Sequence, residues 1–173
     1  MSLYQDSVVQ MSKMLRNLSA WLGKATAFAK AKECSPDDLV GSRITFDMRP
    51  LAFQIQSACD SAKFAAAKLT GVTPPVHPDT EATMAELEQR IAKVLEFLDG
   101  IQPEQFEGAA EREVTLPFLP GKAMHGADYL REMALPNFYF HVMTAYALLR
   151  MAGVKVGKID YIGSLTLHDA DKE

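Results

Sequence analysis

The stretch LPNFYFHVMTAYALLRMAGV, residues 135–154, decides the fold. It is one of the most apolar segments of the chain, yet it contains Pro136, Asn137 and His141. These residues, and the lack of a second such segment, argue against a membrane-spanning helix, which needs about 20 predominantly apolar residues. A buried bundle helix over about 127–152 fits better, with a kink or break expected at the proline.

Three more amphipathic helices are predicted from apolar residues that recur at helical spacing. They cover residues 3–32, residues 50–71 and, after a cap at Asp79 or Thr80, the segment that ends at Gly100. Pro120 and Gly121, between two short apolar runs, predict a small hairpin before the last helix. The sequence therefore predicts an all-α four-helix bundle, and we take residues 1–173 as one domain.

The composition of the chain is that of an ordinary soluble globular protein, and it disfavours several kinds of partner. The chain has 173 residues, of which 48% are hydrophobic and 23% charged, and a net charge of −4. An acidic balance disfavours nucleic acid and anionic membrane surfaces as partners. Cys34 and Cys59 have no metal-site or disulfide spacing, so we expect free thiols. No secretory signal is visible at the N-terminus, and a cytoplasmic protein is expected.

One polar pair stands out on the last helix. Counting in steps of three and four gives a stripe that we expect to face the bundle interior: Leu130, Ala134, Asn137, His141, Thr144 and Leu148. Asn137 and His141 are four residues apart and stack on one helix face, which is a spacing that two metal ligands on one helix use. Gln54 lies on the predicted inner face of the second helix. We therefore predict a pocket lined by Gln54, Asn137 and His141.

Two interpretations of this pocket stay open. The three side chains could simply satisfy one another as a small buried polar network. As a metal site they are weak, because zinc and similar ions prefer imidazole, thiolate or carboxylate to amide oxygens. Asp47 is the nearest carboxylate, and we expect it to cap the second helix.

The other candidates receive ordinary roles. Tyr139 and Tyr146 are expected to pack, and Arg150 to offset the dipole at a helix end. His77 and His168 are expected to be solvated. The sequence after the last helix has one physical explanation: the tail folds back over the end of the bundle, and Asp160 anchors it there.

The chain resembles an uncharacterised, bacterial branch of the DinB/YfiT-like metalloenzyme superfamily. The resemblance covers essentially the whole chain, and its specific part is "LPNFYFHVMTAYALLRMAGVKVGKIDYIG" together with "DMRPLAFQI". It implies a four-helix bundle, often dimeric, in which three histidines hold a metal. One histidine lies on the second helix, and two form H-x-x-x-H on the last helix, followed by R-G-Q.

Residue by residue, the resemblance retains one of these three histidines. Arg150 and Gly153 match the family ending, and His141 takes the place of the second histidine of the motif. Asn137 takes the place of the first, Gln54 falls nearest the third, and Val-Met-Thr replaces R-G-Q. The resemblance thus implies a degenerate pocket with a non-catalytic or cryptic function and no metal.

The alternative is an enzyme. Related members resemble thiol-type transferases or hydrolases that use a divalent metal (zinc, nickel or manganese). Either interpretation leads us to expect a small-molecule ligand. We also expect a homodimer, because Phe138, Phe140, Val142 and Leu149 are predicted to lie outside the inner stripe.

Overall fold

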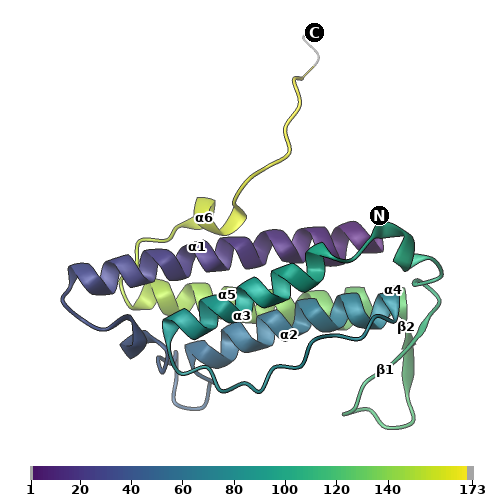
Figure 1. Ribbon diagram of the computed structural model, residues 1–173, viewed down its shortest axis with the longest axis horizontal. Coiled ribbons are helices and arrows are strands. Elements are labelled where there is room, and N and C mark those ends of the chain that lie inside the picture. The colour runs from purple at the N-terminus through teal and green to yellow at the C-terminus, as the bar shows by residue number, and fades with distance from the viewer. Residues whose placement is uncertain (1, 171–173) are drawn as a thin grey trace.

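The computed structural model describes residues 2–170, and it is a bundle of four long helices with a small hairpin at one end (Figure 1). The bundle helices are α1 (Gln10–Ala31), α2 (Leu51–Thr70), α3 (Met84–Asp99) and α5 (Leu135–Met151). The shorter elements are η1 (Gln5–Val9), η2 (Pro36–Leu39), η3 (Pro103–Phe106), β1 (Glu113–Thr115), β2 (Ala123–His125), α4 (Gly126–Asp128), η4 (Tyr129–Ala134) and α6 (Lys158–Ile162). The predicted all-α four-helix bundle is confirmed.

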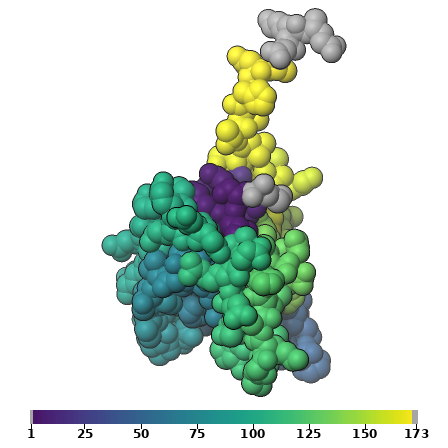
Figure 2. Space-filling view, turned by 90° about the vertical axis from the view of Figure 1, so that its right-hand side faces the viewer, coloured from purple at the N-terminus to yellow at the C-terminus, as the bar shows by residue number. Residues whose placement is uncertain are grey.

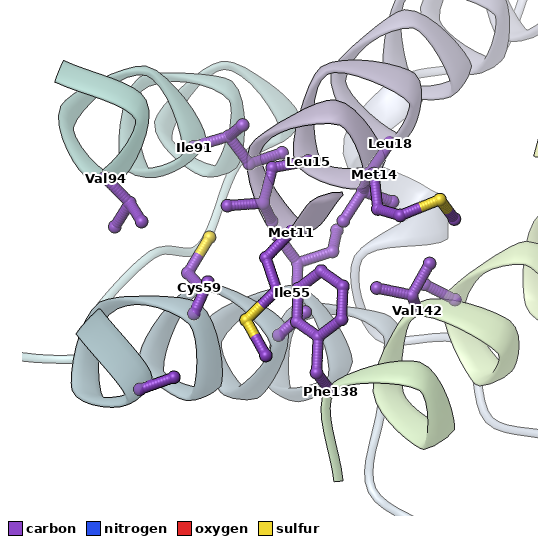
Figure 3. Close-up of a cluster of buried hydrophobic side chains, with 14 of the residues drawn as sticks. Met11, Met14, Leu15, Leu18, Ile55, Cys59, Ile91, Val94, Phe138 and Val142 are labelled. Carbon is purple, nitrogen blue, oxygen red and sulfur yellow. The ribbon is translucent and has the colours of Figure 1, made fainter. Parts of the chain in front are cut away.

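The core forms where the apolar stripes of the four helices meet. Figure 3 shows Met11 and Leu15 of α1 beside Ile55 of α2, Ile91 of α3 and Phe138 of α5. All five side chains are buried, and burial of each contributes roughly 1.5–3 kcal/mol of transfer free energy. The stripes predicted for the first three helices are therefore the ones that pack.

The predicted start of the third helix is wrong by about four residues. Instead of Asp79 or Thr80, Thr83 is the N-cap: its hydroxyl accepts from the backbone N–H of Glu86 at 3.2 Å. The Glu86 carboxylate accepts in return from the Thr83 backbone N–H at 2.9 Å, which completes a capping box. The acidic residues before Thr83, Asp79 and Glu81, contact Arg90 instead.

Helices α2 and α3 run in the same direction. Both begin beside the segment that follows α1, because the Leu51 N–H donates to the Ser42 carbonyl and the Met84 N–H to the Asp37 carboxylate. The loop 71–83 must therefore return along the length of α2 before α3 can start (Figure 1). Three prolines keep this loop extended.

Proline 136 does not break the last helix. The backbone stays helical from Gly126 to Met151, and the irregularity is a π-helical segment, Tyr129–Ala134, which ends two residues before the proline. A π-helical turn shifts the backbone hydrogen bonds by one residue, which accommodates a position that lacks an N–H. Of the expected kink or break, the break is wrong, and the local irregularity is this π-helical segment; the predicted range of the helix is confirmed.

The hairpin and the tail complete the fold. Val114 of β1 pairs with Met124 of β2 in an antiparallel register, at the end of the bundle where α1 begins (Figures 1 and 2). The tail folds back as α6 onto α1, where the Trp21 indole N–H donates to the Asp160 carbonyl at 3.2 Å. The Asp160 carboxylate pairs with Lys24 at 2.5 Å and accepts from the Gly157 N–H at 2.8 Å. Asp160 thus anchors the tail, and residues 164–170 then extend away from the bundle (Figure 2).

Two further expectations can be compared with the structure. Between residues 2 and 170, no helix combines the length and apolar character needed to cross a membrane. Cys34 is exposed and Cys59 is buried, and neither forms a disulfide.

Candidate ligand-binding site

Gln54 and His141 face one another across the contact between α2 and α5. His141 Nδ1 lies 2.8 Å from Gln54 Oε1. The amide nitrogen of Gln54 donates to the Arg49 carbonyl at 2.9 Å, in the turn before α2. Gln54 is almost fully buried, with 2% of its surface exposed, whereas His141 is partly exposed. The predicted contact between these two residues is therefore present.

The contact with Gln54 determines which ring nitrogen of His141 carries the proton. Because the Gln54 amide nitrogen is used by Arg49, the atom that faces His141 is a carbonyl oxygen, which can only accept. Nδ1 of His141 must then carry the proton. Burial lowers the pKa of His141 below its ordinary value, so the ring is neutral at neutral pH. The other ring nitrogen, Nε2, consequently presents a lone pair.

Asn137 has a different partner. Its amide nitrogen lies 2.7 Å from the Ser61 hydroxyl, and that hydroxyl lies 2.7 Å from the Ser57 carbonyl. A carbonyl can only accept, so the Ser61 hydroxyl donates to Ser57 and accepts from Asn137. The three predicted residues therefore form two adjacent contacts between α2 and α5, and not one mutual network.

The predicted inner stripe of the last helix is buried at Leu130, Ala134, Thr144 and Leu148, but the core face of the helix is wider than predicted. Phe138, Val142 and Leu149 are completely buried within the same chain, although they were expected outside the stripe. The core face is centred on these residues, so Asn137 and His141 lie at its edge. Of the four apolar residues expected at the surface, Phe140 is exposed, at 56%.

A cleft of about 330 Å³ opens beside this edge, between α2, α5 and the tip of the hairpin. Its polar lining comes from Ser57, Asp60, Ser61, Lys68, Tyr129, Asn137 and His141. Its apolar lining comes from Phe64, Leu116, Pro117, Phe118, Met133 and Ala134. Clefts of this size and mixed character are typical of small-molecule sites. Gln54 lies behind the lining and acts on it through His141.

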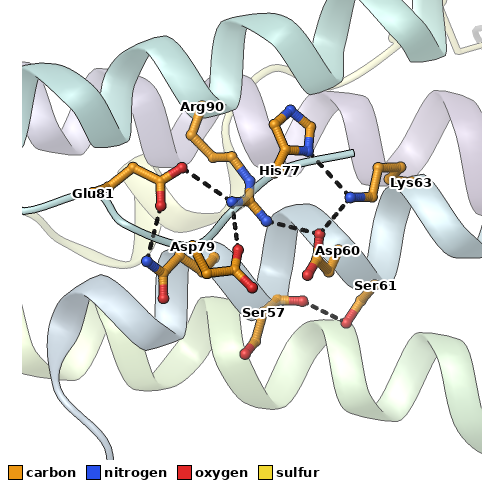
Figure 4. A network of polar contacts seen from close by, with 9 residues as sticks. Ser57, Asp60, Ser61, Lys63, His77, Asp79, Glu81 and Arg90 are labelled. Carbon is orange, nitrogen blue, oxygen red and sulfur yellow. Dashed lines mark hydrogen bonds and ion pairs between the residues drawn. The ribbon is translucent and has the colours of Figure 1, made fainter. Parts of the chain in front are cut away.

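A buried ionic cluster that the sequence did not predict includes Asp60 of the cleft lining (Figure 4). Arg90 of α3 has no exposed side-chain surface and contacts Asp60 at 2.8 Å, Asp79 at 2.6 Å and Glu81 at 3.0 Å. Lys63 of α2, which is also buried, contacts Asp60 at 2.7 Å. The acidic residues of the loop 71–83 thus bind Arg90 and do not cap α3.

Charge states in the cluster follow from these contacts. Burial alone would lower the pKa of Arg90, but its bonds to Asp79 and Glu81 and the charge of Asp60 outweigh it and raise that pKa. His77 Nδ1 lies 3.1 Å from Lys63 Nζ, and burial together with Arg90 and Lys63 lowers the pKa of His77. His77 is therefore a neutral acceptor for Lys63 at neutral pH, and not the solvated loop residue that we expected. A sequence signal existed, since Arg90 falls between Leu87 and Ile91 on the inner stripe of α3.

The remaining sequence candidates have structural roles or none. Asp47 is exposed and does not cap α2, whose first turn has no side-chain cap, so that prediction is wrong. Tyr139 accepts from Gln10 at 3.0 Å, and Tyr146 packs on Trp21. Arg150 donates to the Val156 carbonyl at 2.8 Å and ties down the turn after α5. His168 is exposed, as expected.

The donors of this site do not fit the three-histidine metal centre that the resemblance implies. Gln54 Oε1 already accepts the Nδ1 proton of His141, and Asn137 reaches Ser61 instead. Amide oxygens are neutral and bind zinc-like ions weakly. Within the part of the chain that the structure describes, no three His, Cys, Asp or Glu side chains are grouped so that they could bind a metal ion.

Comparison with known families and structures agrees with this fold. A domain of unknown function, DUF1993, matches residues 3–162. The chain belongs to the DUF1993 family. It is similar to the crystal structure of a DinB family member protein from Shewanella denitrificans, with 46% identity over 97% of this chain and 96% of that chain, and a TM-score of 0.93. This DUF1993 protein therefore has the DinB-like helical bundle. Comparison with curated proteins gives no match.

Proposed function

We propose that this DUF1993 protein binds a small molecule in the cleft between α2 and α5 without a metal ion, and that it is non-catalytic. The observation that supports this most is the chain of contacts from the Arg49 carbonyl through Gln54 to His141. It keeps a neutral imidazole in one orientation, with the Nε2 lone pair left to accept a hydrogen bond at the cleft. Fixed polar groups between apolar walls are what small-molecule recognition requires.

The alternative is a divalent-metal-dependent transferase or hydrolase acting on small thiol-type molecules. One observation favours it: an imidazole whose Nδ1–H is held by a carbonyl oxygen is also how metal-binding histidines are oriented. Against it stands the finding that, among residues 2–170, His141 is not grouped with two further His, Cys, Asp or Glu side chains that could bind a metal ion. We therefore rank the metal-free pocket first.

One experiment separates the two proposals. The protein is purified without an affinity metal or chelator, incubated with excess zinc, nickel or manganese, desalted and analysed for its elements. The metal-free proposal expects far less than one equivalent of each metal. About one equivalent that disappears in His141→Ala would overturn it in favour of the enzyme.

The binding proposal also has a positive test. A library of small molecules is screened by thermal shift on the wild type, on His141→Ala and on the control Asp99→Asn, which changes an exposed residue outside the cleft lining. Compounds that stabilise the wild type and the control, but not His141→Ala, are expected. If no compound depends on His141, the cleft is not a binding site.

We further propose that the chain forms a homodimer. Of the four side chains that the sequence suggested, only Phe140 is exposed, and Met143 of α5 is a further exposed apolar side chain that supports a dimer. Sedimentation velocity at increasing protein concentration is expected to show a dimer, which Phe140→Ser should weaken. A monomer at every concentration would contradict the proposal.

A further inference from the structure

We propose that the ligand of the cleft is a small organic cation, in which a primary ammonium or guanidinium group is attached to an apolar body. This inference rests on the proposed function, because it assigns a ligand class to the same cleft. Its basis is that three side chains along the polar part of the lining offer hydrogen-bond acceptors to a ligand, and that one of them is a carboxylate.

The first two acceptors are on α5. His141 presents the lone pair of Nε2, because Gln54 fixes the proton on Nδ1. Asn137 uses its amide nitrogen to donate to Ser61, whose own proton goes to the Ser57 carbonyl. The Asn137 carbonyl oxygen is therefore the part of the amide left to accept from a ligand. Both orientations follow from the fixed partners of these side chains.

The third acceptor is Asp60 of α2. Arg90 and Lys63 both contact its Oδ1 atom, at 2.8 and 2.7 Å, and Figure 4 shows both dashed lines reaching that one oxygen. The second carboxylate oxygen is not used by either cation. Asp60 also lines the cleft, with 27% of its side chain exposed. The buried cations thus hold the carboxylate in place and leave one oxygen for a donor.

The charge around Asp60 favours a cation over a neutral donor. The cluster contains two cations, Arg90 and Lys63, and three carboxylates, Asp60, Asp79 and Glu81, which gives 2 − 3 = −1. His77 adds no charge, since it accepts from Lys63. A charge-assisted hydrogen bond to a carboxylate is roughly twice as strong as a neutral one.

The other groups of the cleft are compatible with this ligand class. Lys68 is the cation in the lining, and its Nζ atom donates to the Thr115 carbonyl of β1 at 3.0 Å, toward the hairpin. The hydroxyls of Ser57 and Tyr129 can donate or accept. Phe64 and Phe118 provide aromatic walls for an apolar body. An ammonium group near Asp60, with its hydrocarbon part against these rings, satisfies both halves of the cleft.

The test compares three probes of similar shape and different head group: 2-phenylethylamine, 2-phenylethanol and 3-phenylpropionate. Binding to the full chain is measured by ligand-observed NMR and calorimetry, and fragments of this size are expected to bind with a Kd of about 1 mM. The amine should bind at least about tenfold more tightly than the alcohol, because its bond to Asp60 is charge-assisted. The carboxylate should bind least.

Variants locate the binding. Asp60→Asn removes the charge but keeps an oxygen for Arg90 and Lys63, and Asn137→Leu removes an acceptor outside the ionic cluster. Each should weaken amine binding about tenfold. The control Asp99→Asn removes an exposed carboxylate that pairs with Arg16 and does not line the cleft, and it should leave binding unchanged.

The outcomes also separate this inference from the proposed function. Equal binding of amine and alcohol, preference for the carboxylate, or no binding of any probe would overturn the cationic ligand class. In those cases compounds from the thermal-shift screen that depend on His141 would still support a binding cleft. Amine binding that persists in both Asp60→Asn and Asn137→Leu would overturn the assignment to these residues.

Discussion

Replacing Arg90 by methionine should be among the most damaging single changes in this protein. Arg90 has no exposed side-chain surface and contacts three carboxylates. Methionine approximates its aliphatic part but leaves these carboxylates without their shared cation. Removing one partner of a buried ion pair costs far more than the pair contributes net, because the remaining charge is left desolvated.

The magnitude follows from the exposure of each partner. Asp79 is half exposed, so loss of its pair should cost at most about 1 kcal/mol. Asp60 and Glu81 have side chains only 27% and 13% exposed, and together they bring the expected cost to about 3–5 kcal/mol. A domain of this kind has about 5–15 kcal/mol of total stability, so the variant should fold but unfold at much lower denaturant.

The assay is urea unfolding at pH 7, followed by circular dichroism. The matched control is Arg16→Met, because Arg16 makes an exposed pair with Asp99 at 2.7 Å and should lose less than about 1 kcal/mol. Adding Glu81→Gln to Arg90→Met should recover part of the loss, since the desolvated charge of Glu81 is then gone, whereas Asp60 keeps Lys63 as its partner.

The effect should also depend on pH. Hydrogen bonds from the Glu81 backbone, Gln56 and Arg90 outweigh burial and lower the pKa of Glu81 below its ordinary value of about 4.3. The stability that this carboxylate provides is therefore complete above its ordinary pKa and is lost as the pH falls through the lowered one. The difference between wild type and Arg90→Met should shrink in that acidic range. Equal stability of Arg90→Met and Arg16→Met at pH 7 would refute the reasoning.

Three further predictions concern other parts of the chain. Histidine NMR should give His141 a pKa below about 6.5, and protonation of this ring should destabilise the fold as the pH falls below that value. Gln54→Glu should raise the pKa of His141, because it places a carboxylate at Nδ1. An unchanged pKa in this variant would contradict the contact between the two residues. Gly126→Ala should lower the free energy of unfolding, measured by chemical denaturation, by about 3 kcal/mol or more, because the new Cβ would lie 2.0 Å from the Ala109 carbonyl oxygen. Gly23→Ala is the control. A Cβ there meets nothing within 4 Å, so this change should stabilise α1 by about 0.5–1 kcal/mol. Iodoacetamide at pH 8 should label Cys34 in the native protein and both thiols in denaturant by mass spectrometry, because burial raises the pKa of Cys59 to about 12; native labelling of Cys59 would show that α2 opens.

The bundle could be predicted from the sequence because apolar spacing depends only on local geometry. Leu15, Ile55 and Ile91 fall on stripes of period 3.6 and are buried as that period requires. The start of α3 could not be chosen in the same way. Asp79, Thr80 and Thr83 are all acceptable N-caps by residue type. Thr83 is the cap because Asp79 instead binds Arg90, a tertiary contact that no local pattern encodes.

Part of the candidate site could also be predicted from the sequence. Spacing and the resemblance both selected Gln54 and His141, whose contact requires only that α2 and α5 pack side by side. The pairing of Asn137 with Ser61 depends on how far one helix is shifted along the other, which no local pattern encodes. The role of Asp60 could not be predicted from the sequence, because it depends on contacts with Lys63 of α2 and Arg90 of α3.

The shared direction of α2 and α3 limits how the chain can change length. Helix α2 has 20 residues and so is about 30 Å long, and the loop 71–83 has to cover that distance in reverse. Fully extended, its 13 residues reach at most about 45 Å. The loop can therefore lose only roughly four residues before it becomes too short to reach the start of α3 in its present position in the core. Insertions carry no such limit, because each doubling of a loop's length costs only about 0.6 kcal/mol. Among natural variants of this fold, the connection should therefore lengthen freely but rarely shorten.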